Sequence, residues 1–510
     1  MKTLVTNAGG RADQILPHVL LIEQKKDAGG LMLQVQALAQ AMLGTSLETT
    51  FNYPVELSAA PATAVSTAPV PPCQVTQSCR TADPLAPEHY LGPSAVAWPL
   101  GTLQTSPRAN DLMTSMGANT TVAIIDAPPI AAEPTGELPP RVRGYDIGPA
   151  TSALGPGHGT QVASVLFGQH NGQYSEGIAP AATRHQYGVG IPDLGSATSL
   201  ATASMLLSDV LILFEGLDSP FTAPDVLSMS AGLPFGFTPL RDVIGRLSNR
   251  GVLMFFAAGN ESANDCLYPA RYNFPNSICV GATGVVLATG QVDSYQPATY
   301  SNRGVDIALP GTGIPVPRVD AAGVLVRDAF GNLIYDPLDG TSFATPHAAG
   351  LAARILSELR ANPGRYPQVA GLSRPEIAGY VRNLLFTKTT DVGSVGFDRE
   401  TGHGIPDLAA IFEQLQADAT PSAFQMKQTI QEWNDPTVFG NPFLSQYLAR
   451  TQASNPLTRI ALNYTFSRGS CASTSGKLSI DKPKLDVSIA AFQGAITVDD
   501  RGHRHHGRLL

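Results

Sequence analysis

The feature that most constrains this chain is the alternation of short apolar runs with helix-like segments between residues 83 and 416. The helix-like segments repeat apolar side chains every three or four residues, and they are Gly159–Phe167, Leu240–Asn249 and Ser342–Arg360. The apolar runs predict strands: Thr121–Ile125, Val226–Met229, Val252–Ala257, Ser277–Gly281 and Val305–Leu309, with Val210–Phe214 as a further buried strand. Such alternation is typical of a mostly parallel sheet covered by helices on both faces. We therefore expect an α/β domain over residues 83–416.

The remaining sequence predicts smaller units on either side, as expected for 510 residues, which is more than one core usually organises. Residues 1–57 predict a small β-α-β unit, with strands at 18–23 and Leu47–Tyr53 around a helix at Gly30–Leu43. Residues 58–82 are rich in Pro and Ala and predict a linker. Residues 417–510 form an extension of unassigned fold, with a helix-like run at Gln425–Trp433 and a strand-like piece at Ile460–Phe466.

Composition and charge exclude several classes of protein. Hydrophobic residues make up 43% of the chain and charged residues 15%, which favours a large buried core. The net charge of −8, with Lys and Arg scattered, argues against a nucleic-acid partner. No apolar run is long enough to span a bilayer. The first residues also lack the apolar core of a secretory signal, so the sequence carries no recognised export signal.

The five cysteines do not form a disulfide framework in a chain of this length. Cys73 with Cys79, and Cys266 with Cys279, are close enough in sequence to pair, which would leave Cys471 single. Buried free thiols remain the alternative for each pair. No cysteine or histidine spacing indicates a zinc site, and we expect no metal-ligating residues.

Ser342 stands in a turn, Gly340-Thr341-Ser342, which opens a predicted helix. A serine at a helix start is commonly an N-cap, which binds a backbone N–H. The same position suits a nucleophile, because the first N–H groups and the positive end of the helix dipole would stabilise a developing oxyanion. This segment alone leaves both interpretations open.

His158 lies between two glycines just before another predicted helix, and Asp126 ends the apolar run Val122–Ile125. A lone histidine is often structural, but imidazole is the usual proton acceptor for a hydroxyl nucleophile when a carboxylate orients it. The carboxyl ends of parallel strands gather functional groups, which favours Asp126 as that carboxylate. A turn or helix-cap role for Asp126 remains open.

Asn260 ends a further apolar run, Phe255–Gly259, with two small residues before it. Asparagine is common in turns, and that is the simplest explanation for it. As a side-chain donor, its amide could instead bind the carbonyl oxygen that Ser342 attacks.

Together these four segments closely resemble the subtilisin family of serine proteases, in which Asp, His, Asn and Ser follow in this order. The resemblance runs from 83 to 416 and includes family landmarks in sequence: Gly177–Pro180, Ser228–Gly232, Tyr268–Ala270, Ile278–Ala282, Tyr300–Gly304 and Val305–Gly311. It implies a serine endopeptidase with the triad Asp126, His158 and Ser342, an oxyanion donor in Asn260, and an acyl-enzyme intermediate. A protein or peptide substrate would lie extended along the binding residues Ser230, Ala231, Gly232, Ala258 and Gly259.

The sequence departs from the family's usual pattern at several positions. Ala127-Pro128 follows Asp126 where Thr or Ser and then Gly are usual, and proline removes a backbone donor beside the carboxylate. Gln161 stands in place of a second histidine, and Phe343 in place of a methionine. A long connection from Gly311 to Gly340 is expected to form a hairpin with its turn at Gly331-Asn332.

The resemblance also carries expectations about maturation, cofactors and location. Residues 1–57 would be a propeptide, cleaved somewhere within residues 58–95, although an unrelated docking domain is the alternative. No cofactor is required, and a structural calcium ion would be expected from the resemblance alone. The terminal cluster His503–His506 is more typical of a solvated tail than of a metal site. The resemblance implies a secreted or cell-envelope protein, and a cytoplasmic one remains open.

Two other functions remain as alternatives. A relative of the same fold could perform one dedicated maturation cut or ligate peptides through the same acyl-enzyme. An inactive member could serve as a binding module, but that reading predicts a lost triad residue, and Asp126, His158 and Ser342 are all present.

Overall fold

A computed structural model gives the structure of residues 11–16, 19–23, 54–57, 459–468, 471–481, 496–498 and 504–506, and of 114–419 with internal gaps. The gaps are 132, 134–135, 148–156, 170–176, 190–203, 289–290, 321, 330 and 332. Several predictions lie outside these described residues: the helix Gly30–Leu43, the strand Leu47–Tyr53, the run Gln425–Trp433 and the pair Cys73 and Cys79.

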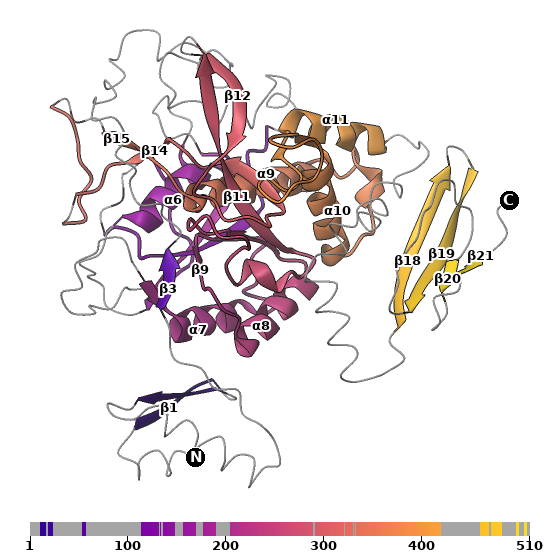
Figure 1. Ribbon diagram of the computed structural model, residues 1–510, viewed down its shortest axis with the longest axis horizontal. Helices are drawn as coiled ribbons and strands as arrows, with labels where there is room; N and C mark the ends of the chain where they lie inside the picture. The colour runs from indigo at the N-terminus through magenta and orange to yellow at the C-terminus, as the bar shows by residue number, and fades with distance from the viewer. Residues whose placement is uncertain are drawn as a thin grey trace.

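A mostly parallel sheet lies at the centre of the structure, which confirms the predicted fold class (Figure 1). Its strands follow in the order β12-β11-β10-β8-β4-β6-β5, and β13 also pairs with β11 in parallel. Strands β11 and β12 pair with each other antiparallel. The bounds are β4 Thr121–Asp126, β5 Asp146–Ile147, β6 Thr183–Val189, β8 Val226–Met229, β10 Leu253–Ala257, β11 Ser277–Ala288, β12 Gln291–Pro297 and β13 Ile307–Pro310.

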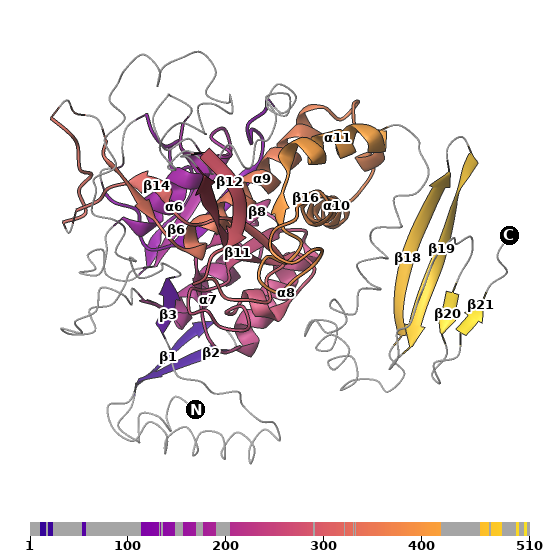
Figure 2. The same cartoon turned by 45° about the horizontal axis from the view of Figure 1, so that its top comes forward.

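Helices cover both faces of this sheet because alternate residues of its buried strands point in opposite directions. In β4, Val122 and Ile124 join the core beneath helices α6 (His158–Phe167) and α9 (Thr341–Ala361). Ala123 and Ile125 join the second core, beneath α7 (Leu207–Leu217) and α8 (Thr238–Asn249). Figure 2 shows the two layers from a second direction. Because both faces of the central strands are covered, the sequences of these strands are nearly continuous apolar runs.

The predicted strand Val210–Phe214 is wrong, since these residues lie inside α7. Four of the five residues are fully buried and the fifth, Ile212, is half-buried. A helix buried on most of its surface presents an unbroken apolar run, and over five residues such a run cannot be told from a buried strand.

Two further helices and two small sheets complete the described domain. Helix α10 (Arg374–Thr387) begins with a capping box between Ser373 and Glu376, and α11 (Leu408–Ala419) follows it. The short elements are η3 Ala270–Tyr272, η4 Pro367–Val369, β14 Ile314–Pro317 paired with β15 Tyr335–Leu338, and β16 Thr389–Thr390 paired with β17 Ile405–Pro406. The chain turns back between Arg327 and Leu333, which form an antiparallel bridge around the predicted hairpin turn.

The described strands outside residues 83–416 form two sheets of their own, and one further strand, β3 (Pro54–Leu57), joins two short strands of the domain. Strands β1 (Arg11–Leu16) and β2 (Val19–Glu23) pair antiparallel. Strand β3 pairs antiparallel with both β7 (Ser204–Leu206) and β9 (Ala231–Gly232). The predicted strand-like piece Ile460–Phe466 lies within β18, and the tail sheet consists of β18 Arg459–Arg468, β19 Cys471–Asp481, β20 Ile496–Val498 and β21 Arg504–His506. The boundaries between the predicted units stay predictions.

The structure also bears on the predictions about cysteine pairing and membrane spans. Cys266 and Cys279 form a disulfide that ties the segment before η3 to strand β11. None of the helices in the described part of the chain is long and apolar enough to cross a bilayer.

Candidate active site

The predicted site residues meet where the carboxyl ends of three parallel strands face the first turns of two helices. Asp126 is the last residue of β4, while Ser230 follows β8 and Asn260 follows β10 by three residues. His158 begins α6, and Ser342 lies in the first turn of α9. This edge is where open parallel sheets gather their functional groups.

Asp126 and His158 are joined directly. His158 Nδ1 lies 2.6 Å from Asp126 Oδ1, and the carboxylate is fully buried while the imidazole is 10% exposed. Within the described residues the imidazole Nε2 is buried and has no hydrogen-bond partner. An imidazole that donates its Nδ1 proton to a carboxylate keeps Nε2 free of a proton, so that Nε2 can accept one.

The two residues beside His158 are glycines because a side chain at either position would clash with neighbouring atoms. A Cβ atom on Gly159 would lie 2.1 Å from the carbonyl oxygen of Ala127, and one on Gly157 would lie 2.8 Å from Val319. The backbone of the first turn of α6 therefore packs against the backbone that follows Asp126. This close approach places the imidazole within reach of the carboxylate.

Ser342 is fully buried, and its side chain points to the strand side of the site. Its Oγ donates to the carbonyl oxygen of Ser230 at 3.3 Å, and Ser230 Oγ in turn donates to the carbonyl oxygen of Ser342 at 2.8 Å. Ser342 Oγ is therefore not bonded to His158 in this structure. Catalytic hydrogen bonds are often incomplete without substrate, and one rotation about χ1 would redirect the hydroxyl.

Asn260 is held in one orientation by Thr341. The Thr341 backbone N–H and hydroxyl each donate to Asn260 Oδ1 at 3.0 Å, and the Gly259 N–H donates to the same hydroxyl at 3.3 Å. Because a backbone N–H can only donate, the oxygen of the amide must face Thr341. The amide nitrogen Nδ2 then faces away from Thr341, and it is buried without a partner among the described residues.

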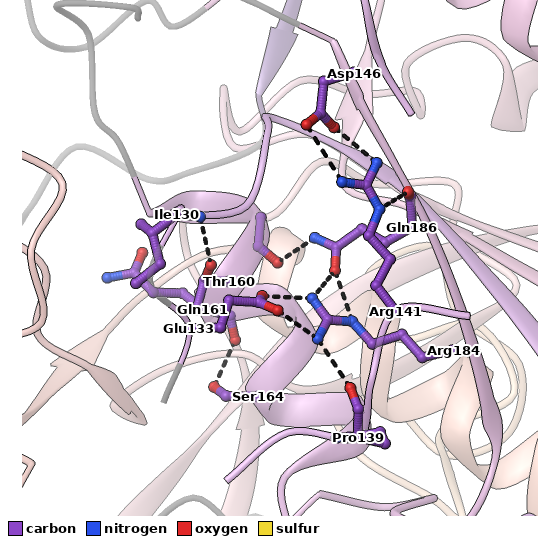
Figure 3. A network of polar contacts seen from close by, with 11 residues as sticks. Ile130, Glu133, Pro139, Arg141, Asp146, Thr160, Gln161, Ser164, Arg184 and Gln186 are labelled. Atoms are coloured by element: carbon purple, nitrogen blue, oxygen red, sulfur yellow. Dashed lines mark hydrogen bonds and ion pairs between the residues drawn. The ribbon is translucent and has the colours of Figure 1, made fainter. Parts of the chain in front are cut away.

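A polar network anchors the first turn of α6 from the other side (Figure 3). Gln186 Nε2 donates to the carbonyl oxygen of Gly159 at 2.9 Å. Arg184 Nε donates to Gln186 Oε1 at 2.9 Å, which fixes which end of the amide faces Gly159. Arg184 also binds Glu133 and the carbonyl oxygen of Pro139, both in the connection after Asp126. The fully buried guanidinium thus links the segments that carry Asp126 and His158.

Sequence reasoning missed this network and the role of Thr341. A signal was present for Arg184 and Gln186, because both lie in a buried strand at alternate positions, which places two long polar side chains on one covered face. Thr341 gave no such signal, since its partner Asn260 lies 81 positions earlier in the chain.

The departures noted in the sequence have defined contacts. The Ala127 N–H donates to Asp126 Oδ1 at 2.7 Å, so one backbone donor remains despite Pro128, whereas Oδ2 has no partner within the described residues. The Phe343 ring centroid lies 5.9 Å from that of His158. Gln161 Nε2 donates to the carbonyl oxygen of Pro317 and so ties α6 to β14.

The other predicted binding residues adjoin Ser230 and Asn260 in the chain. Ala231 and Gly232 form β9, and Ala258 and Gly259 lead to Asn260; all four are buried. In the part of the chain that the structure covers, no cluster of three or more His, Cys, Asp or Glu side chains could hold a metal ion. A structural calcium ion remains a prediction of the family resemblance.

His347, one turn beyond Ser342, gives a prediction about acid stability. It is 3% exposed, its Nδ1 donates to the carbonyl oxygen of Pro310 at 3.0 Å, and burial lowers its pKa to about 4. The folded-state pKa is thus below the unfolded value near 6.5, so the unfolded chain binds a proton at this histidine more readily than the folded protein does. The free energy of unfolding is therefore unaffected by this group above pH 6.5 and decreases as the pH falls from 6.5 toward 4. The loss should amount to about 3 kcal/mol of unfolding free energy.

Denaturant unfolding of Ser342→Ala, which lacks the hydroxyl that the family resemblance predicts to be the nucleophile, should be compared with Ser342→Ala/His347→Gln between pH 4 and 7. The double variant has no titrating group at this position, so its stability should fall less on acidification. Parallel pH profiles for the two proteins would contradict the assignment of acid sensitivity to His347.

The sequence of this chain is similar to those of known proteins. The sequence model described as the Subtilase family matches residues 143–404, a stretch that includes His158, Asn260 and Ser342. The chain is 31% identical to Subtilisin DY of Bacillus licheniformis over 283 residues, which is 54% of this chain and 86% of that protein. It is 30% identical to Subtilisin E of Bacillus subtilis over 277 residues, 53% of this chain and 64% of that protein.

A solved structure supports the same fold. The crystal structure of fervidolysin from Fervidobacterium pennivorans, a keratinolytic enzyme related to subtilisin, aligns with a TM-score of 0.56 at 21% identity, over 81% of this chain and 59% of that one. The family match spans half of the chain, and the mostly parallel sheet with its covering helices agrees with it. The chain belongs to the subtilase family and is a homologue of the subtilisins.

Proposed function

We propose that this protein is a serine endopeptidase that hydrolyses peptide bonds with Asp126, His158 and Ser342 as its catalytic residues. The observation that carries the proposal is the 2.6 Å contact between Asp126 and His158, whose buried Nε2 lacks a partner within the described residues, at the same strand edge as Ser342. His185 also has a buried ring nitrogen without a partner among the described residues, but only the ring of His158 is paired through its other nitrogen with a buried carboxylate at this edge.

The mechanism follows from these three side chains. Ser342 Oγ turns from Ser230 toward His158 and adds to the substrate carbonyl, while Nε2 takes the hydroxyl proton. Asp126 holds the imidazole in the tautomer with the proton on Nδ1 and stabilises the imidazolium that forms. The imidazolium then gives its proton to the leaving amine, and an acyl-enzyme remains. Water attacks the ester by the same steps in reverse and releases the second product.

Asn260 and the start of α9 supply the oxyanion site in this proposal. The amide nitrogen of Asn260 has no partner among the described residues and would donate to the oxygen that becomes negative. The first N–H groups of a helix have no partners within the helix, so the backbone N–H of Ser342 is the natural second donor.

The pairing of β3 supports an extended peptide as substrate. Glu56 pairs with Gly232 and Leu57 with Ala231, antiparallel, so a segment from the predicted propeptide adds a strand to the residues expected to bind substrate. Added-strand binding provides main-chain hydrogen bonds that do not depend on sequence. We propose that β3 occupies the substrate strand of the unprocessed protein, and that the N-terminal unit that contains it is removed by cleavage.

The proposal is tested with a fluorophosphonate probe, which labels serine nucleophiles that a base activates. The purified protein should be labelled, and Ser342→Ala should not be labelled and should keep its N-terminal region uncleaved. Thr345→Ala, which also removes a buried hydroxyl from the first turns of α9, is the control and should still react. Labelling that persists in Ser342→Ala, or that never occurs in the wild type, would overturn the assignment of Ser342.

A further inference from the structure

Two stretches of small residues flank the place where the attacked carbonyl would lie. One is 230–232, after β8, and the other is 258–260, after β10. The segment Leu267-Tyr268 lies between them: the Leu267 N–H donates to the carbonyl oxygen of Ala258 at 2.9 Å, and Tyr268 exchanges backbone hydrogen bonds with Leu233 at 2.7 and 2.8 Å. This segment therefore closes the space between the two stretches.

The side chain of Leu267 stands in that space. A Cβ atom on Gly232 would lie 2.6 Å from Leu267 Cβ and 2.9 Å from its Cδ1, and a Cβ atom on Gly259 would also lie 2.9 Å from Cδ1. One leucine thus contacts both glycines, one on each side. Leu267 is only half-buried, so part of its side chain is exposed to solvent.

The register of β3 indicates which substrate residue faces Leu267. Residues directly opposite each other in an antiparallel pair project to the same face, and the faces alternate along a strand. In a substrate that binds in the register of β3, the residue opposite Gly232 therefore projects toward the side on which Leu267 lies. The substrate residue two positions later, opposite Ser230, projects to the same side. Because Ser230 is hydrogen-bonded to Ser342, that second position carries the carbonyl nearest the nucleophile.

The geometry points to a restricted specificity: Leu267 limits the residue immediately before the scissile bond to a small side chain, namely Gly, Ala or Ser. This inference rests on the proposed function, since it concerns the substrate of that same site. A large side chain at this position would have to displace Leu267 or the strand.

Leu267 cannot move aside easily, because its neighbours hold the segment on both sides. Cys266, directly before it, is bonded to Cys279 in β11. After it, the Tyr268 and Tyr272 rings lie 4.8 Å apart, and the Tyr272 hydroxyl donates to the carbonyl oxygen of Phe237 at 2.8 Å. Because the segment that carries Leu267 is held in this way, Leu267 excludes large substrate side chains by steric contact alone.

The chain's own sequence is consistent with this specificity. Continuing the register of Glu56 and Leu57 by one step would align Ser58 with Ser230, and Ser58 is followed by Ala59 and Ala60. Cleavage after a small residue at Ser58-Ala59 is therefore the expected maturation cut, within the predicted range of residues 58–95.

The test compares two peptide p-nitroanilides that differ only in the residue before the scissile bond, Ala or Phe. The wild type should have a kcat/KM at least about 10-fold higher for Ala, because a pocket discriminates by roughly 10–200-fold for each methylene it cannot accommodate. Leu267→Ala should shift the ratio toward Phe by at least about 10-fold. Leu247→Ala removes the same atoms from a core leucine of α8 and should leave the ratio unchanged.

The outcomes separate this inference from the proposed function. No cleavage of either peptide, together with no probe labelling, would count against the protease assignment. A labelled wild type that prefers Phe would overturn the small-residue specificity and leave the protease intact. A preference for Ala that Leu267→Ala does not change would overturn the role of Leu267. Mass spectrometry of the processed wild type should give Ala59 as the new N-terminus, and a cut after a large residue would contradict the inference.

Discussion

Asp126→Asn is expected to lower kcat about 10⁴-fold at neutral pH while leaving KM nearly unchanged. Asp126 Oδ1 accepts the Nδ1 proton of His158 at 2.6 Å, and it is buried, so no water can take its place. An asparagine can present its NH₂ group there, which favours the tautomer with the proton on Nε2 and leaves Ser342 without a base. The expected size is that known for the same substitution in the trypsin-like triad.

The matched control for this prediction is Asp306→Asn. Asp306 is another buried carboxylate beside the sheet; burial raises its pKa to about 6, and its Oδ2 accepts the Cys279 N–H at 2.7 Å. It lies outside the proposed machinery, so Asp306→Asn should keep the wild-type kcat. Steady-state kinetics of both variants, normalised by active-site titration, make the comparison. A loss below about 10-fold in Asp126→Asn would show that this carboxylate does not orient the base.

The sequence allowed the centre of the site to be predicted because each of its residues is placed by a local rule. Asp126 and Asn260 follow buried apolar strands, and His158 and Ser342 begin helices, so their positions depend on elements that short segments specify. The parallel sheet then brings the strand ends together without further information. The bounds of the elements next to the site were close for the same reason: β8 matches its prediction, and α6 and α9 begin one residue earlier than expected. By contrast, β11 continues to Ala288 beyond its predicted end at Gly281, and strand β6 was not predicted.

Features that depend on distant contacts could not be predicted from the sequence. Gln186 reaches Gly159 across 27 positions, and Leu267 contacts glycines on two different segments. The sequence signals that Gln186 is a polar residue on a covered strand face, but it does not show which backbone group this side chain reaches. Nothing near Leu267 in the sequence distinguishes it from a core leucine. The pairing of β3 with β9 joins segments that are about 175 positions apart and likewise depends on the folded domain. Specificity is therefore determined by residues that a motif does not include.

Asn260→Asp is expected to lower kcat by at least 10²–10³-fold, the approximate loss known for removing the equivalent donor from subtilisin, an enzyme of this family. The substitution is nearly isosteric and isolates one atom. Oδ1 can still accept from the Thr341 N–H and hydroxyl, so the start of α9 keeps its contacts. Only Nδ2 is replaced, by a carboxylate oxygen that would repel the developing oxyanion.

Asn260→Ala is the necessary comparison, because it removes the repulsion but also leaves the Thr341 donors without their acceptor. If Nδ2 is the oxyanion donor, Asn260→Asp should have the lower kcat of the two and the higher thermal stability, since it alone keeps Thr341 satisfied. KM should change little in either variant, because the interaction forms only in the transition state. An Asn260→Asp protein as active as the wild type would mean that Asn260 serves only to hold Thr341, and that the oxyanion is bound by backbone groups.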